Sequence, residues 1–71
     1  MAFTPADAQR HNKKADTDEL RRIWANVANS ERDKLLSIGS SESVADGIAI
    51  KEANRVTDKT RKYIKSRVHW T

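Results

Sequence analysis

Five cationic side chains and no acid occur in residues 59–71, and this is the densest group of chemically active residues in the chain. The cations are Lys59, Arg61, Lys62, Lys65 and Arg67, with Tyr63 among them. Cations interleaved with an aromatic ring suit phosphate contacts and one stacked base. If all five neutralise a phosphate, log K falls with log salt at a slope of about −4 to −5 on duplex DNA. No helix-turn-helix, zinc-finger or RNP motif accompanies them, so we expect any binding to be independent of base sequence.

Other residues that could do chemistry lack the required spacing. His11 and His69 lie at opposite ends of the chain, without the His-x-x-x-His spacing of a metal site. Asp16, Asp18 and Glu19 lack the loop and the closing Glu of a calcium site, and the start of a helix accounts for them. Cysteine is absent, which excludes a thiolate metal site or nucleophile. We predict no catalytic residues, no metal site, no cofactor and no small-molecule substrate, because so small a chain has little room for a water-excluding pocket.

Four apolar or aromatic residues near the two ends are suited to docking on a partner: Phe3, Tyr63, Val68 and Trp70. We expect Phe3 to anchor in a neighbouring groove. Trp70, in a basic terminus, could stack on a base, fill a partner's pocket or fold back on its own helices. We expect docking on a partner or on the chain itself rather than base stacking.

The composition is that of one small, polar domain. The chain has 71 residues, of which 37% are hydrophobic and 34% charged, and its mean hydropathy is −0.84. Such domains bury only about 60% of the surface of the unfolded chain, so helix pairing, oligomerisation or a larger partner should stabilise it. No apolar run approaches the ~20 residues of a membrane span, and the first residues do not resemble a signal peptide. We expect a protein that is neither secreted nor in a membrane.

The net charge of +4 is distributed unevenly. Residues 1–15 carry +2, residues 16–58 carry −3 and residues 59–71 carry +5. We predict a basic N-terminal arm over 1–15, a helical core over 16–58 and a basic C-terminal tail over 59–71. Within the N-terminal arm a short turn of helix over Pro5–Ala8 is also compatible with the sequence, since proline suits a first helical position. Such arms suggest contact with nucleic acid, an acidic protein face or a membrane surface. Basic ends that only keep the protein in solution are an equal alternative.

Apolar periodicity predicts a first long helix over residues 17–38. Its buried face is formed by Leu20, Ile23, Trp24, Val27 and Ala28 and continues through Leu35 and Ile38 to Gly39, a typical residue after a helix. Asp16, with Glu19 three residues later, predicts the N-cap. Trp24 lies at the centre of this face, which predicts a core position.

A second helix is predicted from about Ser41 to Asp58 or a little beyond. It is rich in alanine on its apolar face and contains Gly47, which a close helix–helix contact would explain. The five-residue connection predicts an antiparallel pair. The expected fold is all-α, a small helical hairpin of two main helices with extended N- and C-terminal arms. We expect Asn29 and Asn54 to hydrogen-bond each other across the hairpin and fix its register.

The tail has two possible structures. Ile64, Ser66, Val68 and Trp70 alternate with polar or aromatic residues, which is typical of a strand. A helix that continues to about Ser66 is the alternative.

Three segments, His11–Thr17, Arg22–Ser30 and Ala49–Val56, together resemble a module of small bacteriophage proteins and of larger head-associated phage proteins. The module is distantly similar to the ChaB-like domain family, once described as putative cation-transport regulators. The resemblance implies a compact helical fold with no known catalysis and supplies no functional residue. The charged segment Glu31–Ile38 and the basic tail depart from the family's pattern, so we expect any special function in the arms.

These expectations favour a non-enzymatic structural or virion-associated protein of a bacteriophage, located in the virion or the host cytoplasm. Its partners would be other phage structural proteins or copies of itself, contacted by the hairpin and the arms. The alternative is a small nucleic-acid-binding protein, independent of base sequence, that acts on DNA in the infected cell through the basic tail. An adaptor that docks on a host protein through Phe3 or Trp70 is a third possibility.

Overall fold

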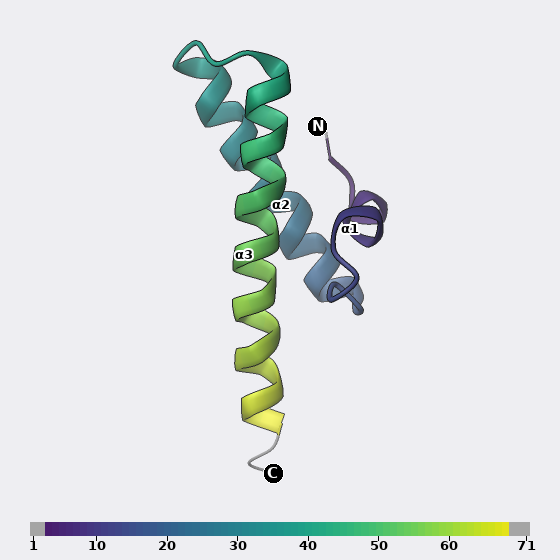
Figure 1. Ribbon diagram of the computed structural model, residues 1–71. Coiled ribbons are helices and arrows are strands. Elements are labelled where there is room, and N and C mark those ends of the chain that lie inside the picture. Colours follow the sequence, from purple (N-terminus) through teal and green to yellow (C-terminus); the bar gives the residue numbers. More distant parts are fainter. Residues whose placement is uncertain (1–2, 69–71) are drawn as a thin grey trace.

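The computed structural model describes residues 3–68, with side chains described as far as Ile64. Three helices make up the fold: α1 (Pro5–His11), α2 (Asp18–Ser37) and α3 (Glu42–Val68). Helices α2 and α3 form an antiparallel hairpin, and α1 packs against the N-terminal half of α2 (Figure 1). Residues 3–68 contain no strand. The all-α class is confirmed, whereas the expected two-helix hairpin is in fact a three-helix fold.

The N-cap of helix α2 lies one residue later than the predicted cap, Asp16. The N-cap is Thr17, whose hydroxyl oxygen accepts a hydrogen bond from the Leu20 amide at 3.1 Å. Asp16 lies outside the helix, where its carboxylate faces Arg61. The other end agrees with the prediction, because Gly39 has a φ of +94°, a conformation that glycine adopts without steric cost.

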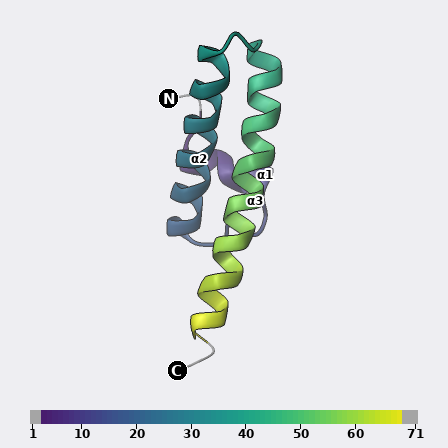
Figure 2. The same ribbon diagram turned by 90° about the vertical axis from the view of Figure 1, so that its left-hand side faces the viewer.

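Helix α3 continues through residues 59–68 of the basic tail, so for these residues the strand prediction is wrong and the helical alternative holds. The Ser41 hydroxyl caps its first turn by accepting from the Val44 amide at 3.3 Å. After Gly47 the helix contains neither glycine nor proline, and its lysines and arginines are good helix formers. The helix therefore runs past the start of α2 and protrudes from the body of the molecule, which measures 47 × 20 × 15 Å (Figure 2).

Residues 3–15 are part of the folded body, which corrects the prediction of an extended arm for this part of residues 1–15. Pro5 opens α1, and the Asp7 carboxylate accepts from the Thr4 amide at 3.0 Å. Phe3 is 8% exposed and meets the indole of Trp24 edge-on, with 5.5 Å between ring centroids. His11, itself exposed, stacks on the same indole at 5.5 Å. The segment folds back because Trp24 offers apolar surface that the hairpin alone leaves uncovered.

The core is built around Trp24, with Phe3, Leu20 and small alanines beside it. Trp24 is fully buried and confirms its predicted core position. Fully buried alanines of both long helices belong to the same cluster: Ala28 of α2 and Ala49 and Ala53 of α3. Gly47 does not explain this close approach, since it is exposed and no atom lies within 4 Å of where its Cβ would stand.

Asn29 and Asn54 do not bond each other. Asn54 accepts a hydrogen bond from the indole nitrogen of Trp24 at 2.8 Å. Asn29 bonds the backbone of Phe3. Each amide satisfies a buried or half-buried polar group of another element, so both help to set the geometry but with other partners than expected.

Candidate nucleic-acid interface on helix α3

Four cationic residues follow the solvent-facing side of α3. They are Lys51, Arg55, Lys59 and Lys62, all exposed, and we call them the cationic stripe. Their spacings of four, four and three residues place them on one face of an α-helix. At a rise of 1.5 Å per residue the stripe extends over about 16 Å. It is straight and rigidly supported, because the opposite face of α3 packs against α2.

Three of the four cations form no ion pair with the side chains that the structure describes. They are Lys51, Lys59 and Lys62. The nearby acids have partners elsewhere. Asp58 accepts from the Asn12 side-chain amide at 3.0 Å and faces Lys14 at 4.0 Å. The stripe therefore presents three exposed ammonium groups that no described carboxylate contacts as an ion pair.

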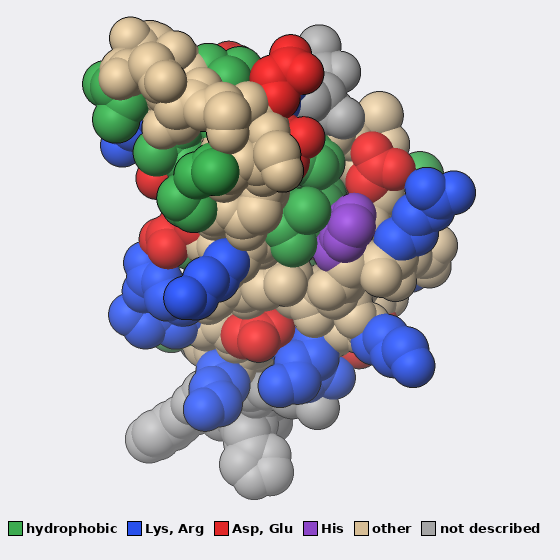
Figure 3. Space-filling model, turned by 45° about the horizontal axis from the view of Figure 1, so that its top comes forward, with side chains coloured by type: hydrophobic (Ala, Val, Ile, Leu, Met, Phe, Trp, Pro, Cys, Tyr) green, Lys and Arg blue, Asp and Glu red, His purple; other side chains and the backbone are tan. Residues whose placement is uncertain are grey.

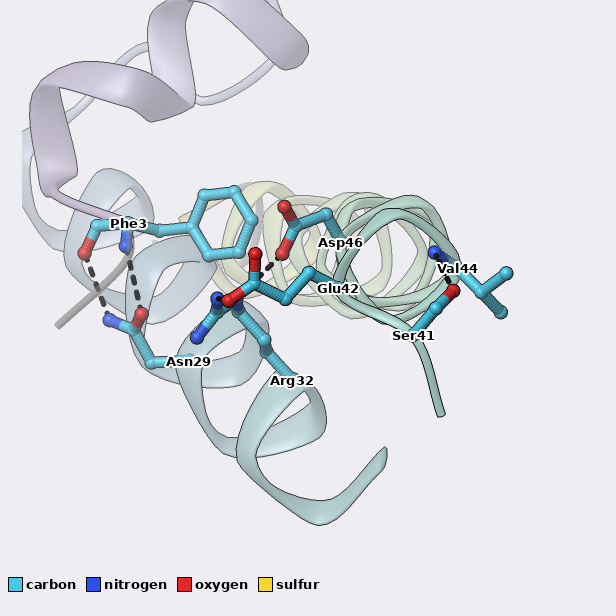
Figure 4. Close-up of polar contacts among 7 residues, drawn as sticks. All are labelled: Phe3, Asn29, Arg32, Ser41, Glu42, Val44 and Asp46. Atoms are coloured by element: carbon cyan, nitrogen blue, oxygen red, sulfur yellow. Dashed lines mark hydrogen bonds and ion pairs between the residues drawn. The ribbon is translucent and has the colours of Figure 1, made fainter. Parts of the chain in front are cut away.

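The Asp46 and Glu42 carboxylates are held near the hairpin turn by Arg32 of α2. The guanidinium Nε of Arg32 donates to the Asp46 carboxylate at 2.6 Å, and Nη2 of Arg32 lies 3.7 Å from Oε1 of Glu42 (Figure 4). This pairing keeps two acids of α3 at the end of the helix away from the stripe.

Arg55 is the one member of the stripe with a partner. Its guanidinium makes a two-point contact with the Glu52 carboxylate one turn earlier, with the Nε–Oε2 bond at 3.2 Å. This hydrogen bond holds the pKa of Glu52 below its usual value, and the nearby positive charges of Arg55, Lys34 and Lys59 act in the same direction. Glu52 therefore remains charged at neutral pH and weakens the positive potential at Arg55.

The structure divides the five predicted phosphate-binding residues. Lys59 and Lys62 belong to the stripe. Arg61 does not, because its guanidinium is half-buried and its Nη2 donates to Asp16 at 3.1 Å. The side chains of Lys65 and Arg67 lie outside the described residues.

The four predicted partner-binding residues also separate. Phe3 is buried in the chain's own core, so it is not available as an anchor for a neighbour. Tyr63 is 63% exposed at the edge of the stripe. Val68 ends α3, with its side chain outside the described residues, as is the whole of Trp70.

Sequence reasoning missed two features of this face. Lys51 was assigned to the core region, although its four-residue spacing to Arg55 and Lys59 was a readable signal. The other is an exposed apolar patch at the hairpin end, formed by Ile38, Val44 and Ile48, which are 78%, 52% and 42% exposed. Figure 3 shows hydrophobic side chains around the hairpin turn and Lys and Arg side chains farther along the molecule.

Other kinds of site find no support in the part of the chain with described positions. Among these residues, no group of three His, Asp or Glu side chains is placed to hold a metal ion. No described helix is long and apolar enough to span a membrane.

Comparison with known protein families, curated proteins and solved structures finds no match to this chain. Function is therefore inferred from the geometry of the chain itself.

Proposed function

We propose that this chain is a non-enzymatic protein that binds the phosphate backbone of nucleic acid, independently of base sequence, through the cationic stripe of α3. The observation that carries this proposal is the exposed row of Lys51, Lys59 and Lys62, whose charges have no acidic partner among the described side chains. A row of unpaired cations on a rigid helix neutralises several phosphates at once and releases their counterions. Tyr63 at its edge supplies one aromatic surface for an unpaired base.

The stripe supports backbone contacts rather than base reading. The lysine ammonium is a flexible point charge and lacks the fixed planar geometry with which arginine and asparagine distinguish base edges. The one arginine in the stripe is occupied by Glu52. Affinity should therefore depend strongly on salt and little on sequence.

A titration of fluorescent duplex and single-stranded oligonucleotides by anisotropy, repeated from 50 to 200 mM salt, tests the proposal. Replacing Lys51, Lys59 and Lys62 together by Gln should make the slope of log K against log salt shallower by about 2.7 on duplex DNA, at about 0.9 per phosphate contact. Two oligonucleotides of unrelated sequence should bind wild type equally.

A matched control carries the same loss of charge elsewhere. Arg10, Lys13 and Arg22 are exposed and belong to the other side of the molecule, on α1, the following loop and α2. Their triple Gln variant should retain most of the wild-type slope. If the two triple variants lose affinity equally, or if wild type does not bind, the stripe is not the interface.

The second candidate is a structural or virion-associated protein of a bacteriophage. The observation that favours it is the apolar patch of Ile38, Val44 and Ile48, since exposed apolar surface of this kind is typical of protein contacts. Because residues 3–15 pack on the chain's own core, they do not form an arm that could extend into a neighbouring subunit. Quantitative mass spectrometry of purified particles tests this role: a fixed copy number relative to the major capsid protein supports it, and absence from particles excludes it.

A further inference from the structure

A groove lies where the start of α2 meets the protruding part of α3. It has a volume of about 310 Å³ and is lined by Asp16, Thr17, Glu19, Leu20, Arg61 and Ile64. Leu20 and Ile64 form its apolar floor, and Asp16 and Glu19 stand at its acidic edge. Asp18, the next residue of α2, does not line the groove, and its carboxylate accepts from Arg21 at 3.2 Å.

The groove exists because α3 extends beyond the start of α2, the helix against which it packs. The face of α3 that α2 covers begins at Ala45 and continues through Thr57 to Ile64. Helix α2 starts at Asp18, beside Arg61 and Ile64, whereas α3 continues to Val68. Beyond this point no described element lies over that face, as the lower part of Figure 2 shows.

Arg61 has one guanidinium donor at the groove that no described residue accepts. Its Nη2 donates to Asp16 at 3.1 Å, but its Nε is buried and has no partner among the described residues. A buried donor without an acceptor is destabilising in proteins generally. A segment that covers the groove and brings an acceptor to this nitrogen would remove that penalty.

The charges around the groove indicate what covers it. An apolar floor bordered by the carboxylates of Asp16 and Glu19 suits a cationic helix with apolar residues on one side. This chain contains such a segment: from Ile64 onward it carries Lys65 and Arg67 and no acid. We propose that the groove is occupied by the protruding end of α3 from a second copy, so that the chain forms a two-fold symmetric dimer.

In this dimer the two α3 helices cross antiparallel near Ile64. The protruding end of each copy then occupies the groove of the other, so the two groove contacts are equivalent. Each protruding end then runs toward the acidic start of α2 in the other copy. The stripe cations Lys59 and Lys62 do not oppose this contact, because they lie about 140° and 160° around the helix from Ile64 at 100° per residue. The proposed dimer therefore leaves both cationic stripes exposed.

Sedimentation equilibrium of the full chain, without nucleic acid, from 10 µM to 1 mM tests this inference. We expect a monomer–dimer equilibrium for wild type and a dissociation constant raised at least tenfold by Ile64→Lys, with unchanged helical circular dichroism. A monomer at every concentration, whether the groove is empty or filled by the chain's own last residues, overturns the proposal.

Exchanging the charges of the groove and of the protruding end tests whether these two surfaces recognise each other. Glu19→Lys should weaken the dimer, and so should the double variant Lys65→Glu with Arg67→Glu. An equimolar mixture of the two should associate again, since both contacts of the mixed dimer then pair opposite charges. Asp33→Lys, an equal charge change at an exposed position far from the groove, should leave the equilibrium unchanged. Failure of the mixture to associate, or equal effects of Glu19→Lys and Asp33→Lys, overturns the proposal.

This inference does not depend on nucleic-acid binding. The triple Gln variant of Lys51, Lys59 and Lys62 should dimerise as wild type does, and the Ile64→Lys variant should still bind oligonucleotides. Each proposal can therefore fail without the other.

Discussion

The side-chain amide of Asn29 holds the backbone of Phe3 at two points. The Phe3 amide donates to Asn29 Oδ1, and Asn29 Nδ2 donates to the Phe3 carbonyl, both at 2.9 Å (Figure 4). A single side chain of α2 thus takes the place of a neighbouring strand for this residue. The contact positions the phenyl ring of Phe3 against Trp24, and so attaches the N-terminal segment to the hairpin.

Replacing Asn29 by Ala should lower the free energy of unfolding by about 1–3 kcal/mol, because it leaves half-buried backbone groups of Phe3 unpaired. Urea titration followed by far-UV circular dichroism measures the change. Asn26→Ala is the control, since Asn26 is exposed on the same helix and alanine favours helix there. Equal stabilities of the two variants would show that the two-point contact contributes nothing to the fold.

Asn54→Leu should be destabilising by about 1–3 kcal/mol, because it removes the acceptor of the fully buried indole N–H of Trp24. The same change should cost less in a Trp24→Phe background, where no indole donor remains. Urea denaturation of the four proteins gives the coupling energy. Strictly additive effects would contradict the role assigned to this hydrogen bond.

Thr57→Val should raise the free energy of unfolding by about 1 kcal/mol. Thr57 is fully buried, and its hydroxyl has no partner among the described residues, whereas valine has the same shape without the polar atom. Thr60→Val is the matched control one turn away, since the Thr60 hydroxyl donates to the Val56 carbonyl at 2.9 Å. The control should gain nothing. A loss of stability in Thr57→Val, measured by thermal and urea unfolding, would indicate that the hydroxyl has a partner in solution.

Gly47→Ala should also be stabilising, by about 1 kcal/mol, because alanine favours helix and its Cβ would meet no atom within 4 Å. Gly39→Ala should have the opposite sign, a loss of about 1 kcal/mol, since Gly39 has a φ of +94°. Both are measured as shifts of the urea midpoint. A destabilised Gly47→Ala protein would reveal a contact at Gly47 in solution.

Glu52→Gln should tighten nucleic-acid binding and make the salt slope steeper by about 0.9, because it frees Arg55 to contact a phosphate. Glu42→Gln, at the far end of α3 beside Arg32, should leave the slope unchanged. Anisotropy titrations of both variants against wild type measure the effect.

Glu52 should also make the stability of the protein depend on pH. The Arg55 hydrogen bond lowers the pKa of Glu52 below its ordinary value of 4.5. The Glu52–Arg55 contact therefore contributes stability above pH 4.5, and this contribution is lost as the pH falls through the lowered pKa. Over that range wild-type stability should fall relative to Glu52→Gln, as measured by urea denaturation. A constant difference between the two proteins would contradict this.

Local patterns in the sequence predicted the two long helices and the turn between them. The spacing from Leu20 to Ala28, the capping residues before α2 and the glycine at position 39 each act within a few residues, so no distant contact is needed to interpret them. The helical tail was one of two alternatives, because a short alternating run is compatible with either structure.

Tertiary structure decided which residues are buried or paired within the chain and which remain exposed. Phe3 was expected to contact a partner but is buried on Trp24, and Asn29 and Asn54 bond other groups than each other. Arg61 was expected to bind phosphate but faces Asp16, 45 residues earlier in the chain. Hydrophobic and ionic contacts between distant segments depend on where the helices meet, which periodicity does not specify. The sequence by itself therefore determined where the cations gather along the chain, and only the packing of α2 and the residues before it against α3 determined which of those cations are exposed.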